Sequence, residues 1–330
     1  MPSAAHSDSL PPDGVGVEVA ASTQDRLFSD SRRPPEPLCV LSHGMGQEST
    51  ALGYMLVEDP AVRRRYAPGR LLTFASATGN EHDETDEHLD YLKTYYAAAE
   101  EHFEHITPDQ GHHTGTWHDL ESFYAAGDRI GSKSYPRACT WNLKIAPFYK
   151  KLEAVLAADY GVAHGHKKGL YEYVRITGQK IRVLIGFTAG EADRRIDPAE
   201  KVPPWLSRCV QRVYPLHELG MTREDCQDHI RSRGHPDVYP SLCKFCPWKS
   251  PFLVYYQYRF SPRDYYRWVE LEANKIRKWA DTLPPEKNHG VFPGKTLPEV
   301  LEEAAEEFAH LDDEEMHRWR MMGHDVQSRY

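Results

Sequence analysis

The sequence predicts an α/β protein, because short apolar runs typical of buried strands alternate along the chain with longer helix-like segments. These runs cover residues 38–41, 70–78, 103–107 and 182–188. The first run leads through a loop of glycine and serine into a helix-like segment from Ser49 to Glu58. Such a loop favours anion binding, since its N–H groups and the positive end of the helix dipole converge on one point. The sequence therefore predicts a phosphate-binding turn after the first strand.

Length and composition are typical of a globular protein with about two domains. The chain has 330 residues, of which 40% are hydrophobic and 27% charged. It has no apolar run of the ~18 residues that a membrane helix needs, and no secretory signal pattern at its start. We therefore expect no membrane association and a cytoplasmic location. In that compartment the six cysteines are expected to be thiols, metal ligands or redox groups rather than a disulfide framework.

Three segments are predicted from the change in composition along the chain. Residues 1–36 hold few apolar side chains and many Ser, Pro, Asp and Gly, so we expect a disordered leader there. Residues 37–250 contain the strand-like runs and are expected to form a nucleotide-binding domain with a cysteine site. Residues 251–330 are expected to form an extension of two helices.

The predicted extension has recognisable helix starts. Ser261 followed by Pro262 suits the beginning of one helix. Thr296 and Glu299 have the spacing of a capping box for the other.

Net charge bears on the possible partners. At −9, the protein as a whole is not expected to attract nucleic acid nonspecifically. Two local segments could still do so: residues 164–168, and a run in which Arg259, Arg263 and Arg267 alternate with Tyr and Trp. For the second segment, we favour the interpretation that it is a helix that packs its aromatic face on the core.

A loop at 109–118 holds three histidines, but their spacing fits no helical pair of metal ligands.

The predicted phosphate loop lacks the Gly-Lys-Ser/Thr of a P-loop and the G-x-G-x-x-G of a dinucleotide fold. Residues 42–52 resemble instead the Ser-x-Gly-x-Gly-x-(Asp/Gln)-Ser-Thr-Ala-Leu loop of the adenine-nucleotide α-hydrolase superfamily, and most closely that of its PAPS (phosphoadenosine phosphosulfate) reductase-like members. Glu48 departs from the family's Asp or Gln. The resemblance implies nucleotide contacts from Ser42, Gly44, Gly46, Gln47, Glu48, Ser49 and Thr50. Without a ligand, the same stretch would be a glycine-rich turn.

Two further segments resemble nucleotide-contacting parts of this family. Residues 79–85 are similar to the family's Asp-Thr-Gly-x-Glu-x-x-x-Thr stretch, which implies a role for Gly79 and Glu81. A solvated acidic helix start is the alternative there. Residues 186–195 resemble Gly-x-x-x-x-Glu-x-x-Arg, which implies that Gly186, Glu191 and Arg194 shape the substrate pocket. A structural Glu–Arg salt bridge is the equal alternative.

The cysteines suggest a reaction centre. Residues 137–147 resemble Arg-x-Cys-Thr-x-x-x-Lys-x-x-Pro of the same family, in which Arg137 and Lys144 would contact phosphate and Cys139 would face the chemistry. Cys243 and Cys246 form a C-x-x-C-Pro motif, whose thiolates can converge on one metal or on each other. Otherwise Cys139 would be a small buried hydrophobe.

Three thiolates in one pocket would suit a [4Fe–4S] cluster, which normally takes four ligands. The fourth would come from Cys209 or Cys226, or one iron would stay open. Zinc is the competing metal, and a metal-free persulfide or disulfide is the third alternative.

The resemblance spans residues 37–250 and implies a doubly wound parallel sheet, Rossmann-like, with the nucleotide at the carboxyl ends of the strands. It implies ATP-dependent sulfur transfer: an acceptor carbonyl is adenylated with release of pyrophosphate, and sulfide or persulfide then displaces AMP. ATP with Mg²⁺ would be needed, with a cysteine desulfurase or sulfide as sulfur donor. We expect Arg137, Lys144 and Arg194 to stabilise phosphate charge, and a homodimer is possible.

Two alternatives remain for the function. Reduction of PAPS or its relative would need the Glu-Cys-Gly-x-His segment of true reductases, and no cysteine follows Cys246. A nucleotide-binding accessory protein of a DNA-modification system is the other. The acceptor is either a small molecule or a nucleobase of DNA or tRNA, and the acidic balance slightly favours the small molecule.

Overall fold

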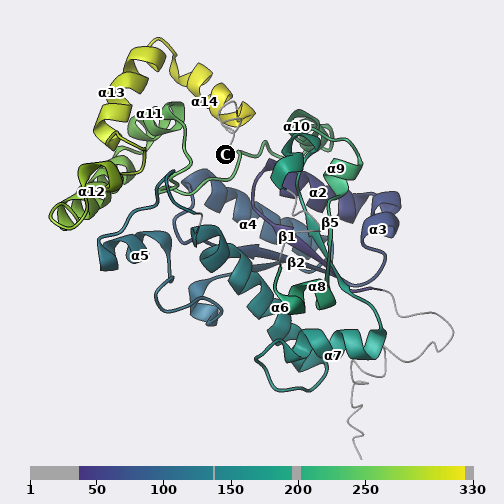
Figure 1. The fold of residues 1–330 in the computed structure, drawn as a ribbon. Coiled ribbons are helices and arrows are strands. Elements are labelled where there is room, and N and C mark those ends of the chain that lie inside the picture. The colour runs from purple at the N-terminus through teal and green to yellow at the C-terminus, as the bar shows by residue number, and fades with distance from the viewer. Residues whose placement is uncertain (1–36, 137, 195–201, 324–330) are drawn as a thin grey trace, which may run out of the picture. The chain divides into compact units, whose positions relative to one another are not determined.

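The structure is a computed structural model that describes residues 37–136, 138–194 and 202–323 (Figure 1). The described residues form one compact unit. The predicted leader at 1–36 lies outside the described residues, and the predicted boundary at residue 250 stays a prediction. No helix in the described part is long and apolar enough to cross a membrane.

A parallel sheet forms the centre of the described chain, with strand order β3-β2-β1-β4-β5. The chain starts in the middle, extends to one edge, returns, and extends to the other, which is the doubly wound arrangement. The predicted fold class is therefore confirmed. The strands are β1 (Cys39–His43), β2 (Leu71–Ser76), β3 (Glu104–Ile106), β4 (Ile181–Ile185) and β5 (Val210–Val213).

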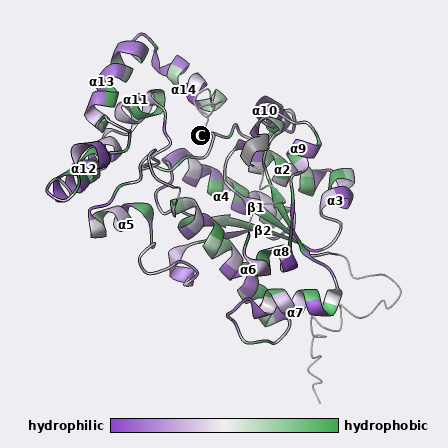
Figure 2. Ribbon diagram, in the orientation of Figure 1, coloured by the Kyte–Doolittle hydropathy of each residue, from purple (hydrophilic) through white to green (hydrophobic). Residues whose placement is uncertain are grey.

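Alternate residues of β1 belong to two different cores, one on each face of the sheet. Cys39 and Leu41 pack under one layer of helices, and Leu38 and Val40 under the other. This alternation follows from the two-residue period of a strand, and Figure 2 shows the hydrophobic colour concentrated on the central strands. The first layer comprises α2 (Gln47–Glu58), α3 (Pro60–Tyr66), α4 (Asp83–Ala98) and α10 (Arg223–Ser232). The second comprises α6 (Ala146–Asp159), α7 (Lys168–Thr177) and α8 (Pro204–Cys209).

The helical extension differs from the prediction of two helices, because four are present in the described part. The predicted helix start at Ser261 and Pro262 is confirmed, and it divides the aromatic–basic run, interpreted as one helix, into two. Ser250 caps the first half by accepting from the Leu253 amide, and Pro262 begins the second. The four are α11 (Pro251–Phe260), α12 (Pro262–Lys278), α13 (Leu297–Phe308) and α14 (Asp313–Met322).

Most aromatic side chains of that run pack inward, as favoured from the sequence, whereas Tyr266 is 59% exposed. Tyr265 and Trp268 are buried in one apolar cluster that also contains Tyr124 of α5 (Leu120–Gly127). Arg267 pairs with Glu121, so at least this arginine is engaged within the protein. The predicted capping box of Thr296 and Glu299 is confirmed at the start of α13.

Candidate functional site

The predicted phosphate loop lies between the end of β1 and the start of α2. Ser49 closes it: its Oγ accepts from the Gly44 amide at 2.9 Å and donates to the Gly46 carbonyl at 3.2 Å. Ser42 lies half-buried in β1, opposite Ile185 of β4 and Phe74 of β2. One turn into α2, Thr50 Oγ1 lies 3.1 Å from Nε2 of the buried His88.

The N-terminus of α2 has no side-chain cap, because Gly46 stands at the N-cap position. Within the described residues, the backbone amides of Gly46, Gln47 and Glu48 donate to no acceptor. Free amides at a helix start, together with the helix dipole, favour an anion. The loop therefore has the local chemistry of a phosphate cradle.

The loop also occupies the point at which the strand order reverses. β1 and β4 are neighbours whose following segments lead to opposite faces of the sheet, which opens a crevice at their carboxyl ends. Gly186, just after β4, approaches α2 so closely that a Cβ there would lie 3.0 Å from the Ser49 amide nitrogen. Glycine is required here because the two backbones almost touch.

Glu48 is held by an arginine that the sequence reasoning missed. Arg223, the first residue of α10, places Nε 2.5 Å from Glu48 Oε1 and an Nη2 3.9 Å from Glu191 Oε1. Burial opposes the charge of Arg223, but Glu48 and then Glu191 outweigh it and raise the arginine pKa. The Glu48 carboxylate is therefore already paired with a cation through Oε1, which weakens it as a ligand for a metal ion.

The other nucleotide-side residues occupy turns at the same edge. Glu81 accepts from the Thr78 amide and hydroxyl at 2.8 and 2.7 Å, and Glu191 accepts in the same way from Thr188 at 3.2 Å. Gly79 has a φ of +76°, which favours glycine, and a Cβ there would collide with Asp119. Arg137 lies outside the described residues, as does the side chain of Arg194.

The segment 241–246 joins the phosphate loop to the cysteines. A Cβ on Gly46 would lie 2.9 Å from the Ser241 amide nitrogen. Cys243 forms an isolated antiparallel bridge with Glu81, and the next amide, that of Lys244, donates to the Asn80 carbonyl at 2.7 Å. The two predicted half-sites, namely the phosphate loop and the cysteine site, are thus in direct backbone contact.

The three predicted cysteines come together. Cys243 and Cys246 lie in one turn, closed by a bond from the Cys246 amide to the Cys243 carbonyl at 3.2 Å. A hydrogen bond from the Cys243 thiol lowers the pKa of Cys246 to about 6 and raises that of Cys243. Burial, then the charge of Cys246, raises the pKa of Cys139. The group therefore favours one thiolate supported by neighbouring thiols.

The remaining cysteines lie elsewhere. Cys226 belongs to the core beneath α2 and Cys209 to the core on the opposite face of the sheet. Neither is brought to the three thiols, so neither is placed to serve as a fourth ligand. In the described part of the chain, no three His, Cys, Asp or Glu side chains stand in metal-binding geometry. The donor chemistry suits a thiolate-bound metal, and the arrangement itself is that of a hydrogen-bonded dithiol beside a third thiol.

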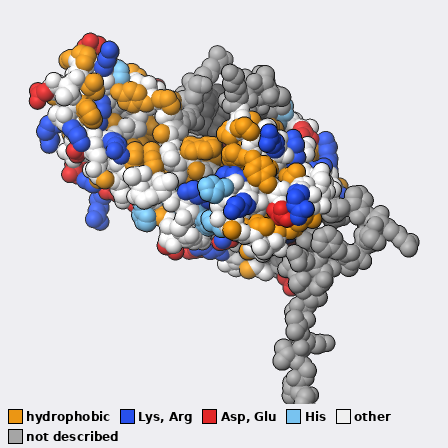
Figure 3. All heavy atoms as spheres, turned by 60° about the horizontal axis from the view of Figure 1, so that its bottom comes forward, with side chains coloured by type: hydrophobic (Ala, Val, Ile, Leu, Met, Phe, Trp, Pro, Cys, Tyr) orange, Lys and Arg blue, Asp and Glu red, His pale blue; other side chains and the backbone are white. Residues whose placement is uncertain are grey.

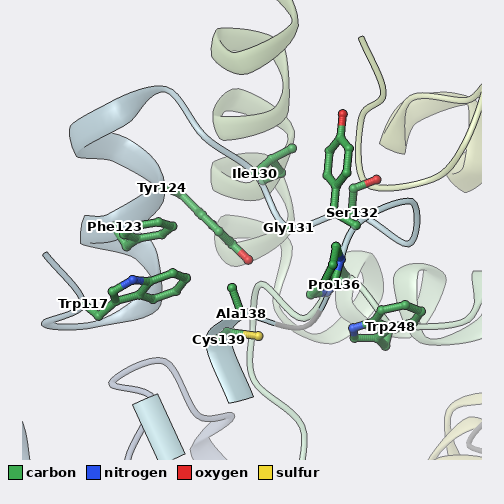
Figure 4. Close-up of a pocket in the computed structure, with 12 residues that line it drawn as sticks. Trp117, Phe123, Tyr124, Ile130, Gly131, Ser132, Pro136, Ala138, Cys139 and Trp248 are labelled. Carbon is green, nitrogen blue, oxygen red and sulfur yellow. The ribbon is translucent and has the colours of Figure 1, made fainter. Parts of the chain in front are cut away.

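A pocket of about 160 Å³ opens beside Cys139. Figure 4 shows Trp117, Phe123 and Tyr124 on one side, Pro136 and Trp248 on the other, and the Cys139 sulfur near its base. Trp117 and Phe123 stack with ring centroids 3.5 Å apart. Cys139 immediately precedes a π-helix (Thr140–Ile145) that continues into α6, and such turns are frequent at functional sites. The pocket is a largely apolar, aromatic compartment with a thiol at one end.

No family model and no curated protein matches the sequence. Among solved structures, the chain is similar to the U34-tRNA thiolase NcsA from Methanococcus maripaludis with its [4Fe-4S] cluster. The alignment covers 84% of each chain at 11% identity, with a TM-score of 0.40. At that TM-score we draw no argument from the likeness.

Two further buried groups near the thiols were missed from the sequence. Lys249 is 1% exposed, and its Nζ donates to His82 Nε2 and the Lys244 carbonyl, both at 2.9 Å, and to Gln257. Burial lowers its pKa to about 7, although the charges of Cys243 and Cys246 oppose the shift. Tyr124 is 3% exposed beside all three thiols. The only sequence signal was Lys249's place three residues after the C-x-x-C motif.

The last helix reaches the phosphate loop. Gln47 Nε2 donates to the Met321 carbonyl at 2.7 Å. Arg320, only 2% exposed, donates to the Pro240 carbonyl at 3.0 Å and pairs with Glu84 of α4 at 3.2 Å. The end of α14 is therefore anchored between the first turn of α4 and the segment that leads to Cys243.

Proposed function

We propose that this protein is an ATP-dependent sulfur-transfer enzyme. The oxygen of an acceptor carbonyl attacks the α-phosphate of ATP, the bond between the α-phosphate and its bridging oxygen breaks, and pyrophosphate leaves. Hydrosulfide then attacks the activated carbon and AMP departs with its oxygen, which leaves a thiocarbonyl after loss of a proton. Adenylation is needed because an oxide oxygen is a poor leaving group and AMP a good one.

One observation carries this proposal: an uncapped phosphate loop and a group of three thiols are in backbone contact at the same edge of the sheet. A phosphate cradle alone supports nucleotide binding, and a dithiol alone supports redox or metal chemistry. Their contact through Ser241 and Cys243 supports a reaction that needs both. Proximity of this kind lowers a barrier by holding the reactants in one orientation.

The amides of Gly46, Gln47 and Glu48 would bind the β- and γ-phosphates, with Mg²⁺ accompanying ATP. Lys144, whose charge reaches all three thiols, would stabilise developing negative charge between nucleotide and sulfur. Arg137 and Arg194 are proposed for the same task. Gly79, Glu81, Gly186 and Glu191 would shape the walls of the nucleotide site.

The thiols would hold or deliver the sulfur. Cys139, Cys243 and Cys246 supply three thiolate donors, which fits a [4Fe–4S] cluster with one iron lacking a cysteine, or zinc. A bound cluster would supply a Lewis-acidic iron able to hold sulfide. In a metal-free alternative, the outer sulfur of a persulfide on one cysteine would attack the activated carbon. A second cysteine would then break the sulfur–sulfur bond, which leaves a disulfide between the two cysteines. A dithiol reductant would be needed to reduce that disulfide. A cysteine desulfurase or free sulfide is the proposed donor.

Calorimetric titration of the anaerobically purified full chain with ATP and Mg²⁺ tests the nucleotide half of the proposal. We expect saturable binding that Ser49→Ala weakens, because Ser49 closes the loop. Thr94→Ala, which removes an exposed hydroxyl on α4, is the matched control. Binding of PAPS in place of ATP would overturn the adenylation proposal and favour sulfonucleotide reduction.

The sulfur half is tested separately. Iron and sulfide analysis with visible absorption after anaerobic reconstitution should give a cluster in the native chain and in Cys209→Ser, and none in Cys139→Ser, Cys243→Ser or Cys246→Ser. Equal loading of all four variants would contradict the proposed ligand set.

A further inference from the structure

Two basic segments that are far apart in the sequence lie side by side along α6. Glu153 of α6 holds the 164–168 segment, since it lies 2.9 Å from His164 Nε2 and accepts from the Gly165 amide at 2.8 Å. Burial, then the charges of Lys151 and His164, lower the pKa of His112, so the 109–118 loop lies near the same part of α6. Burial lowers the pKa of Lys167, the charge of Glu153 opposes this shift, and the charge of Lys150 adds to it. We call this surface the basic face, and it consists of His112, Lys150, Lys151, His164, Lys167 and Lys168.

The basic face is only partly neutralised. Lys151 pairs with Glu104 at 2.5 Å, and His164 lies 2.9 Å from Glu153. No carboxylate in the described part of the chain lies within ion-pair distance of Lys150, Lys167 or Lys168. Lys167 Nζ lies 4.9 Å from the ring centroid of Trp205, and the charge of Glu153 acts on it. A protein with a net charge of −9 thus keeps a local surface on which Lys150 and Lys168 form no ion pair within the described residues. Such a surface attracts an anionic partner despite the acidic whole.

The basic face lies on the helical segment that begins beside the thiol-side pocket. The chain runs from Cys139 through the π-helix into α6, so Lys150 lies about 16 Å further along the axis at 1.5 Å per residue. Between them Trp141 is 45% exposed and Ile145 36% exposed. In Figure 3, where the bottom of Figure 1 comes forward, Lys, Arg and His side chains gather beside a band of hydrophobic ones. An exposed aromatic ring and then the lysines of the basic face therefore follow Cys139 along one continuous helical segment.

We propose that the basic face binds the phosphates of a single-stranded polynucleotide, with Trp141 stacking on a base at the entrance to the pocket. Rows of cations that follow a backbone, combined with aromatic platforms, are the recurring device for such strands. A base must leave the duplex to reach a recessed centre, which favours a single strand or loop. The inference rests on the proposed function in one respect, that the bound strand would carry the acceptor carbonyl.

A salt-dependent binding assay tests the electrostatic part. Fluorescence anisotropy of labelled single-stranded RNA, single-stranded DNA and duplex DNA is measured with the full chain between about 50 and 200 mM salt. We expect the Lys150→Glu/Lys168→Glu double variant to weaken binding about tenfold at low salt. We also expect the slope of log affinity against log salt to fall by about 1.4, since each phosphate contact on a single strand contributes about 0.7.

The control changes the net charge equally at another place. Arg64→Glu/Arg277→Glu reverses two exposed cations on α3 and α12, and we expect its affinity to stay within about twofold of the native value. Equal weakening in both double variants would show that only the whole-protein field matters and would overturn the proposal. Preference for RNA or DNA identifies the source of the strand, and tighter binding of duplex would contradict the single-stranded assignment.

Stacking has a separate signature. Trp141→Ala should lower affinity about tenfold, as expected for loss of one base–aromatic stack, and leave the salt slope unchanged. Trp279→Ala removes another exposed tryptophan, at the end of α12, and should have no effect. Native protein that binds no polynucleotide would overturn the proposal. Native protein that binds strands but not ATP would leave the basic face standing and remove the proposed enzyme function.

Discussion

Arg223 Nε lies 2.5 Å from Glu48 Oε1, which links the first turn of α10 to the first turn of the phosphate-loop helix. Both side chains are largely buried, at 22% and 15% exposure. Arg223→Met should therefore lower the free energy of unfolding by about 2 kcal/mol, because it leaves the largely buried Glu48 carboxylate without its cation. Urea denaturation of the metal-free protein measures the change.

A second variant separates the pair from simple loss of packing. Glu48→Gln/Arg223→Met removes both charges, and it should recover most of the lost stability. If the double variant were less stable than Arg223→Met alone, the ion pair would not be the cause.

Thiol titration in the metal-free protein should show one group that ionises near pH 6, because hydrogen bonding from Cys243 lowers the pKa of Cys246. Ultraviolet thiolate absorbance detects it, and Cys246→Ser should remove the step while Cys209→Ser keeps it. Between about pH 6 and the ordinary thiol pKa near 9, Cys246 is deprotonated in the folded chain and protonated in the unfolded chain. The contribution to stability therefore grows as pH rises through that window and is lost as pH falls through 6.

Substitution of Gly46 by alanine should disturb both half-sites together. The new Cβ would stand 2.9 Å from the Ser241 backbone nitrogen, and backbone yields less readily than a side chain. We expect a loss of about 2 kcal/mol in the free energy of unfolding, as for overpacking, together with a shift in the thiol titration. Gly115→Ala, which meets nothing within 4 Å, is the control, and equal behaviour of the two would contradict the prediction.

Arg320 should be the side chain that fixes α14 to the nucleotide edge. Arg320→Met should cost about 3 kcal/mol, as expected when one partner of a buried pair is removed, and should speed hydrogen exchange in α14. Arg318→Met, two residues away, breaks only an exposed pair with Glu314 and should change stability by less than about 0.5 kcal/mol. Unchanged exchange in α14 after Arg320→Met would show that other contacts hold the helix.

The elements of the fold could be predicted from the sequence where the local residue pattern was strong. The apolar run at 38–41, the small-residue loop after it and the capping box at Thr296 each have one favoured local structure. β5 was missed because two of its four residues, Gln211 and Arg212, are polar. The start of α12 was predicted from Ser261 and Pro262, whereas α11 was missed because helical periodicity in the aromatic–basic run continues across Ser261.

The candidate site was predictable in its parts and not in its contacts. Motif resemblance singled out the three cysteines, which the structure brings together, and the glycines of the loop. The contacts of Arg223 with Glu48, of Lys249 with His82 and of Met321 with Gln47 depend on tertiary packing between segments 167 to 274 residues apart, on which local spacing carries no information. The pairing of the 109–118 and 164–168 segments has the same origin.

The contact between Cys139 and the Cys243–Cys246 turn sets an order of events during synthesis. More than a hundred residues separate the first thiol from the other two, so at roughly 5–20 residues per second Cys139 leaves the ribosome roughly 5–20 s before its partners exist. During that interval it is a single thiol without the neighbours that raise its pKa. Loading of sulfur or metal must therefore follow completion of the chain to at least Cys246, and oxidative damage at Cys139 is expected to fall mainly on nascent chains.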